Sequence, residues 1–99
     1  MKKSKVTITR DAIELAKVLG LSQADGLEIE IRRDLNDKLI EVIKKKNLTH
    51  AQVAKLAKTS RTRVTAIMNR NTFEVSTDLM LRILASLGVR AKLHFKTAA

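Results

Sequence analysis

The 99-residue sequence lacks cysteine, proline, tryptophan and tyrosine, and it has only three glycines and two phenylalanines, Phe73 and Phe95. The absence of cysteine excludes disulfide bridges, thiolate zinc sites and cysteine nucleophiles. The absence of proline favours uninterrupted helices, and the scarcity of aromatic rings leaves an aliphatic core. No apolar run approaches the ~20 residues that span a bilayer, and no apolar segment follows the basic N-terminus as in a signal peptide. We expect one domain, with or without an arm.

Positive charge is in large excess in this sequence. Twenty Lys and Arg oppose ten Asp and Glu, which gives a formal net charge of +10 and a sequence pI of about 10.4. Hydrophobic residues make up 44% of the chain, which is too much for a disordered polycation and enough for a packed core. We therefore expect a soluble, cytoplasmic, mainly α-helical protein that has a polyanionic partner and no membrane contact.

The excess charge is concentrated in one part of the chain. Residues 1–10 carry four bases and no acid, whereas residues 11–41 carry four bases and eight acids. Residues 42–73 contain no acid and hold eight bases, which are Lys44, Lys45, Lys46, Lys55, Lys58, Arg61, Arg63 and Arg70. A solvated surface usually mixes both signs, so this acid-free segment indicates a surface that binds a polyanion.

Hydrophobic spacing predicts two helices in the first half of the chain. A short helix is expected at Asp11–Leu19, with Thr9 as its cap. A second helix is expected from Ser22 to about Lys46, because apolar residues recur every four positions at Leu27, Ile31, Leu35, Leu39 and Ile43. The stretch Leu27–Arg32 also alternates between apolar and charged residues as a β-strand does, and there we favour the helix.

The second half of the sequence predicts three more helices and a strand. Thr49–Gln52 has the composition of a capping box and begins a helix that reaches about Ala57. A helix follows from Ser60 to about Asn69, and a last helix begins at Ser76 or Thr77 and ends before Gly88. The tail, residues 89–96, alternates strictly between apolar and basic residues, which predicts a half-buried β-strand.

The two short helices at residues 49–57 and 60–69 lie inside the acid-free segment and are separated by a tight connection. This is the helix-turn-helix pattern, in which the second helix enters the major groove of DNA. The pattern needs a small residue where the helices cross, and Ala54 meets that need. It also needs apolar residues that pack the pair onto the rest of the domain, and these are Val53, Ala57, Val64, Ile67 and Met68.

The outward residues of the second helix suit the reading of DNA, and they are Ser60, Arg61, Thr62, Arg63, Thr65, Ala66 and Asn69. Arg can form two hydrogen bonds to guanine and Asn two to adenine, and Ala or a Thr methyl group can touch the thymine methyl. The N-terminus that Ser60 caps can accept a phosphate. Arg61 and Arg63 occupy a first turn that prefers acids, at a cost of about 0.3–1 kcal/mol each, and a bound polyanion would offset that cost. On the preceding helix, we expect Lys55 to contact a phosphate.

The segment HAQVAKLAKTSRTRVTAIMN, residues 50–69, resembles the helix-turn-helix of the XRE/Cro-repressor family, and Leu39–Leu87 covers the usual helical core of that family. The longer arrangement, with an N-terminal helix and a final Ala-Ser-Leu-Gly-Val before a strand, is similar to a small antitoxin-like branch of the HigA type. With the elements above, the resemblance implies a five-helix lambda-repressor-like domain over residues 11–99 with a short C-terminal β-strand, after a basic arm at residues 1–10. It implies an autorepressing antitoxin that binds operator DNA as a homodimer and also binds a ribonuclease toxin.

The resemblance also assigns roles to individual residues. It places Arg61, Thr62, Thr65 and Ala66 against the bases, and it places Thr49, His50, Arg63, Asn69, Arg70 and Asn71 near the sugar-phosphate backbone. The turn departs from the family, because Lys58 stands where Gly is usual and Thr59 replaces an apolar residue. We therefore expect Lys58 to adopt a left-handed or otherwise less favourable turn conformation. His50 stands where Gln is frequent, and a phosphate contact there would depend on pH.

No pattern in the sequence predicts catalysis, a cofactor or a metal site. His50 and His94 are the only histidines, and no suitable ligands lie near them in the sequence. No nucleophile is paired with a base, so we do not expect an enzyme. The acids of the expected second helix have the spacing of a solvated face, and they are Glu28, Glu30, Asp34, Asp37 and Glu41.

Two questions about partners stay open at this point. The acidic segment, residues 11–41, is a candidate surface for a basic partner such as a ribonuclease toxin, and toxin neutralisation is an alternative main function. A non-specific nucleic-acid-binding protein is a further alternative, although base-stacking aromatics are lacking. The tail strand needs a neighbour, and it would pair with its counterpart across a two-fold axis or with a strand near Lys5–Ile8.

Overall fold

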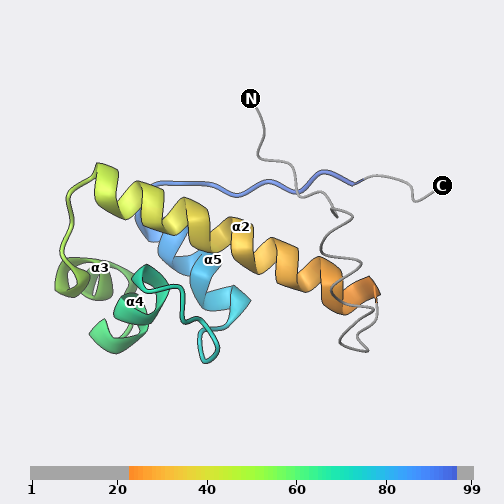
Figure 1. Cartoon of the computed structure of the whole chain (residues 1–99). Coiled ribbons are helices and arrows are strands. Elements are labelled where there is room, and N and C mark those ends of the chain that lie inside the picture. Colours follow the sequence, from red (N-terminus) through yellow and green to blue (C-terminus); the bar gives the residue numbers. More distant parts are fainter. Residues whose placement is uncertain (1–22, 96–99) are drawn as a thin grey trace. The chain divides into compact units, whose positions relative to one another are not determined.

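The structure, a computed structural model, describes residues 23–95 of the chain. These residues form four helices, α2 (Gln23–Lys45), α3 (His50–Ala57), α4 (Arg61–Met68) and α5 (Thr77–Ser86), joined by short connections (Figure 1). The expectation of a mainly helical domain is therefore confirmed. The expected helix Asp11–Leu19 and the basic arm at residues 1–10 lie outside the described residues, so the five-helix count is not supported.

Helix α2 confirms the long helix expected from Ser22 to Lys46. It is continuous over 23 residues, so the strand that Leu27–Arg32 offered as an alternative does not form. Asp25 lies in its first turn and Lys44 and Lys45 in its last, where each charge complements the partial charge of the helix end. The helical period of the apolar residues over the whole segment thus outweighs the local two-residue alternation.

The described residues divide into two compact units. Leu35–Ala91 forms one unit, and residues 23–34 and 92–95 belong to the other. Within residues 23–34, Glu30 is only 5% exposed, so the expected solvated face is wrong at this residue. The reason is its register, since Glu30 follows buried Gly26 by four positions and shares its side of the helix.

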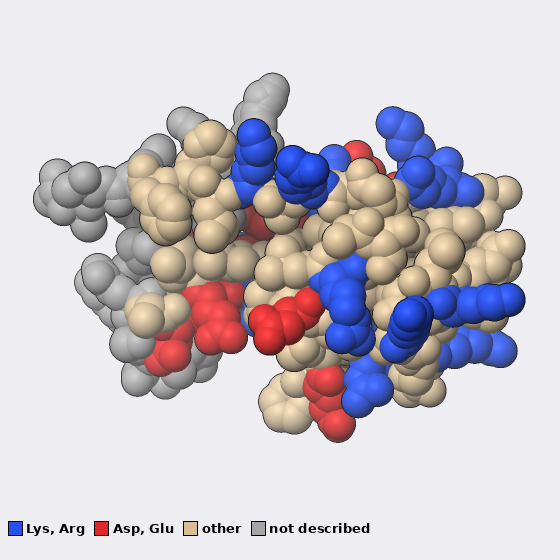
Figure 2. Space-filling model, turned by 180° about the vertical axis from the view of Figure 1, so that it is seen from behind, with Lys and Arg blue, Asp and Glu red and all other residues tan. Residues whose placement is uncertain are grey.

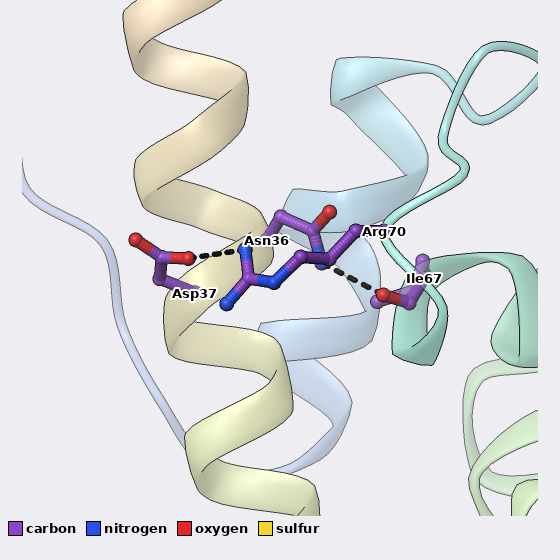
Figure 3. A network of polar contacts seen from close by, with 4 residues as sticks. All are labelled: Asn36, Asp37, Ile67 and Arg70. Carbon is purple, nitrogen blue, oxygen red and sulfur yellow. Dashed lines mark hydrogen bonds and ion pairs between the residues drawn. The ribbon is translucent and has the colours of Figure 1, made fainter.

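The unit Leu35–Ala91 has an aliphatic core to which all four helices contribute. The largest fully buried side chains are Leu39, Ile43, Val53, Val64, Ile67, Met80, Ile83 and Leu84. Figures 1 and 3 show α5 alongside the C-terminal part of α2. Burying one such side chain contributes about 1.5–3 kcal/mol. This matters most for α3 and α4, because isolated helices of eight residues are unstable in water.

The four helices end in the same way, with a left-handed residue just past the last turn. The positive φ angles are 55° at Asn47, 56° at Lys58, 59° at Arg70 and 84° at Gly88. In each case the next backbone N–H donates to a carbonyl of the last turn, as Thr59 does to Ala54 at 2.9 Å. The expected left-handed conformation of Lys58 is confirmed. Only α5 uses glycine here. Asparagine tolerates this region, so the backbone cost of about 1–2 kcal/mol falls mainly on Lys58 and Arg70.

The C-terminal strand expected at residues 89–96 is wrong for the part that the structure describes. Residues 89–95 form no strand, and Leu93 and Phe95 are 66% and 90% exposed. The physical reason is pairing, because residues 23–95 contain no other strand to which this tail could hydrogen-bond. Across the same residues, no helix is both long and apolar enough to cross a membrane.

Candidate nucleic-acid interface

Helix α3 is fixed at its start by the capping box that the sequence predicts. The Thr49 hydroxyl accepts the Gln52 backbone N–H at 3.1 Å, and the Thr49 N–H donates to Gln52 Oε1 at 2.8 Å. Two otherwise unsatisfied donors of the helix end are thereby paired, which contributes about 1 kcal/mol. The prediction for this helix is confirmed at both ends, from Thr49 to the left-handed turn at Lys58.

Helices α3 and α4 pack against each other through the small and apolar residues that the helix-turn-helix pattern requires. Val53, Val64 and Ile67 are fully buried, and the small side chains of Ala54 and Ala57 are nearly so. The small size of Ala54 allows the close crossing that the helix-turn-helix pattern requires. Met68, expected to point inward, is only half-buried.

Helix α4 presents most of its surface outward. Of its eight residues only Val64 and Ile67 are buried. Ser60 caps it by accepting the Arg63 backbone N–H at 3.2 Å, and no acid occupies its first turn, where Arg61 and Arg63 lie exposed. The partial positive charge of the α4 N-terminus and the charges of two arginines therefore lie together on one exposed surface.

The twelve residues that the sequence proposes as DNA contacts lie on α3, α4 and the turns beside them. None of the twelve is buried, and three of them, His50, Thr65 and Ala66, are half-buried. Lys55 is exposed on α3, and Asn69, Arg70 and Asn71 are exposed in the turn after α4. Figure 2 shows Lys and Arg gathered at the end of the molecule where α3 and α4 lie. The DNA-contact role of each residue stays a prediction.

Two of these residues are joined to each other. His50 Nδ1 lies 2.9 Å from Thr65 Oγ1, and this hydrogen bond connects the first residue of α3 to the middle of α4. Which atom donates depends on the tautomer of the imidazole. The bond fixes the Thr65 hydroxyl at the edge of the exposed surface of α4.

A buried asparagine of α2 holds the C-terminal end of α4, a contact that is not among the sequence-based expectations. Asn36, 5% exposed, donates from Nδ2 to the Ile67 carbonyl at 2.9 Å (Figure 3). The same carbonyl accepts the Arg70 backbone N–H at 3.1 Å. A signal existed, because Asn36 sits beside Leu35 and three positions before Leu39 on the inward side of a helix. A polar residue there needs a partner.

Asp37, the residue of α2 that follows Asn36, pairs with Arg70 in the turn after α4. Arg70 Nη1 donates to Asp37 Oδ1 at 2.6 Å, and the two side chains are 57% and 54% exposed (Figure 3). The sequence predicts a solvated acidic face for Asp37 and a position near DNA phosphate for Arg70, and no pattern in it predicts their pairing. Arg70 thus pairs with an acid that lies 33 positions earlier in the sequence.

The exposed surface of α3, α4 and the turns beside them offers hydrogen-bond donors and positive charge. Among residues 23–95, no three His, Asp or Glu side chains are grouped to hold a metal ion. The exposed donors belong to Arg, Lys, Asn, Ser and Thr. Arg and Lys pair well with phosphate, and Arg and Asn pair well with base edges.

Comparison with known families agrees with this geometry. A family model described as a helix-turn-helix domain matches residues 15–96, which is most of the chain. The protein therefore belongs to this helix-turn-helix domain family, a class defined by DNA-binding helix pairs of the kind formed by α3 and α4. No curated protein and no solved structure gave a match.

Proposed function

We propose that this protein is a sequence-specific transcriptional regulator that binds operator DNA through α4. The observation that carries the proposal is that only two of the eight α4 residues are buried, with Arg61 and Arg63 exposed in a first turn that has no acid. Packing against α3 holds this helix in place, so its outward side chains project from a backbone that is fixed before DNA binds. In the complex, Arg61, Thr62, Thr65 and Ala66 face base edges in the major groove.

Phosphate contacts position the protein on the duplex in this proposal. The residues assigned to that role are Thr49, His50, Lys55, Ser60, Arg63, Asn69, Arg70 and Asn71. They lie before, along and after α4, as needed to touch the strands on both sides of a groove. Binding as a homodimer would place two α4 helices about 34 Å apart, one turn of DNA.

Selection of bound sites from random duplex DNA tests the proposal. A regulator yields one recurring sequence, and a symmetric dimer yields a palindrome whose half-sites are about 10 base pairs apart. Recovery of all sequences equally, with strong salt dependence, would instead support a non-specific nucleic-acid-binding protein. No enrichment of any duplex would contradict a DNA-binding function.

A second candidate function is that of an autorepressing antitoxin whose repression of its own operon accompanies the neutralisation of a basic ribonuclease toxin. It is supported by the sequence resemblance and by exposed acids along α2, which include Glu28 and Glu41. These charges complement a basic partner. Co-expression with the product of an adjacent small gene, followed by affinity purification after nuclease treatment, tests it. A stable complex supports the antitoxin role, and absence of any complex contradicts it.

A further inference from the structure

We propose that Asp37 is an internal competitor for DNA phosphate at Arg70. In the unbound protein the Asp37 carboxylate holds the Arg70 guanidinium, and on binding a phosphate takes the place of the carboxylate. This inference rests on the proposed DNA-binding function and deepens it, because it assigns to a residue of α2 the control of one phosphate contact. Asp37 then lowers the affinity for DNA although it lies outside the helix-turn-helix.

The geometry of the ion pair leaves room for this exchange. The 2.6 Å contact joins one guanidinium nitrogen, Nη1, to one carboxylate oxygen, Oδ1. A guanidinium has five N–H donors, and a single contact leaves several of them able to meet a phosphate. Both side chains are more than half exposed, so a phosphate can approach the pair from solvent.

The backbone beneath Arg70 is held, so that only its side chain needs to move. The Arg70 N–H donates to the Ile67 carbonyl at 3.1 Å, and the next N–H, of Asn71, donates to Ala66 at 2.8 Å. Asn36 binds the same Ile67 carbonyl from α2. The first two hydrogen bonds anchor the turn to the end of α4, and the third anchors that end of α4 to α2. The guanidinium can therefore leave Asp37 while the helix stays in place.

Electrostatics explains why the Arg70 guanidinium exchanges the Asp37 carboxylate for a phosphate of DNA. Exposed ion pairs contribute little net stability, because water screens them and two long side chains lose freedom. A guanidinium–phosphate contact releases counterions from the duplex, a gain that the internal pair does not offer. Asp37 also places a negative charge next to the only arginine that follows α4 in the acid-free segment. Removing that charge should tighten binding.

The test compares Asp37→Asn with a matched control on the same helix. Glu41→Gln removes one negative charge four residues further along α2, from a carboxylate that pairs with Lys38 at 3.3 Å and not with Arg70. Affinity for the selected site and for a random-sequence duplex is measured across a salt series. Circular dichroism confirms that each variant is folded.

For Asp37→Asn we expect affinity for both duplexes to rise about threefold to tenfold at low salt. The log–log salt slope should change by much less than the ~0.9 of one phosphate contact, because Arg70 meets a phosphate in both complexes. Glu41→Gln should leave both affinities unchanged. In an Arg70→Ala background, Asp37→Asn should give no gain.

Three results would overturn the inference while leaving DNA binding established. They are equal tightening by Glu41→Gln, a gain that persists in the Arg70→Ala background, and weaker binding by Asp37→Asn. Absence of salt-dependent DNA binding by the unsubstituted protein would instead overturn the proposed function itself.

Discussion

The His50 imidazole and the Thr65 hydroxyl are joined by a hydrogen bond of 2.9 Å between Nδ1 and Oγ1. The sequence resemblance places one of these residues at the DNA backbone and the other at a base. The bond therefore joins a predicted backbone contact to a predicted base contact within the free protein. Both side chains are half-buried.

Single and double substitutions of His50 and Thr65 should show that the two side chains contribute jointly to stability. We expect the effects of His50→Ala and Thr65→Val on the free energy of unfolding to be non-additive by about 0.5–1.5 kcal/mol. The measurement is urea denaturation followed by circular dichroism, because the chain has no tryptophan or tyrosine to report by fluorescence. Thr62→Val, at an exposed position of the same helix, serves as control and should combine additively with His50→Ala.

Substitution of Arg61 tests base reading. Arg61→Ala should weaken binding to the preferred site by about 1–3 kcal/mol and relax the sequence requirement at one base position. Repeating the site selection with the variant measures both effects. An unchanged consensus together with unchanged affinity would remove Arg61 from the reading surface.

Substitution of Lys55 tests a phosphate contact without sequence information. Lys55→Ala should weaken binding to preferred and random duplexes by the same factor and reduce the salt slope by about one. Fluorescence anisotropy with labelled duplexes over a salt series measures this. A loss confined to the preferred site would mean that Lys55 reads a base, contrary to the assignment.

The left-handed turn between α3 and α4 offers a stabilising substitution. Lys58 has a φ of 56°, where glycine avoids the steric cost that other residues carry. Lys58→Gly should raise the free energy of unfolding by about 0.5–1 kcal/mol. The control is Lys55→Gly, inside α3, which should lower it by about 1 kcal/mol. Equal losses from both substitutions in a urea titration would contradict a strained turn.

The buried amide of α2 should be needed for stability. Asn36→Ala removes the donor to the Ile67 carbonyl and should cost about 1–3 kcal/mol. The cost is expected near the lower end, because that carbonyl keeps the Arg70 N–H as a partner. Lys38→Ala, exposed on the same helix, should change stability by less than about 0.5 kcal/mol. Thermal unfolding by circular dichroism compares the two variants.

Local chemistry explains what the sequence predicts well. The Thr49–Gln52 capping box, the Ser60 cap and the left-handed Lys58 all depend on residues close together in the chain, and all three are confirmed. The close packing of α3 and α4 at Ala54 follows from the helical period and from the small side chain of this residue. The helical period of the surrounding residues also decides between helix and strand at Leu27–Arg32.

Contacts between distant parts of the chain explain what the sequence does not predict. Asn36 and Asp37 find partners 31 and 33 residues away, and no local pattern specifies those pairings. Two-residue alternation in residues 89–96 describes which side chains a strand would bury, but a strand also needs a neighbour. The charge and spacing of Glu30 predict a solvated residue, whereas its position on the side of α2 that carries Gly26 determines its burial.

Only Val64 and Ile67 of α4 are committed to the core. The exposed residues Arg61, Thr62 and Arg63 lie outside the core. Substitutions there can therefore change the DNA sequence that is bound with little effect on stability. Libraries that vary the outward positions and keep this apolar pair should yield folded proteins with new operator preferences. The domain is in that sense a reusable scaffold for engineered regulators.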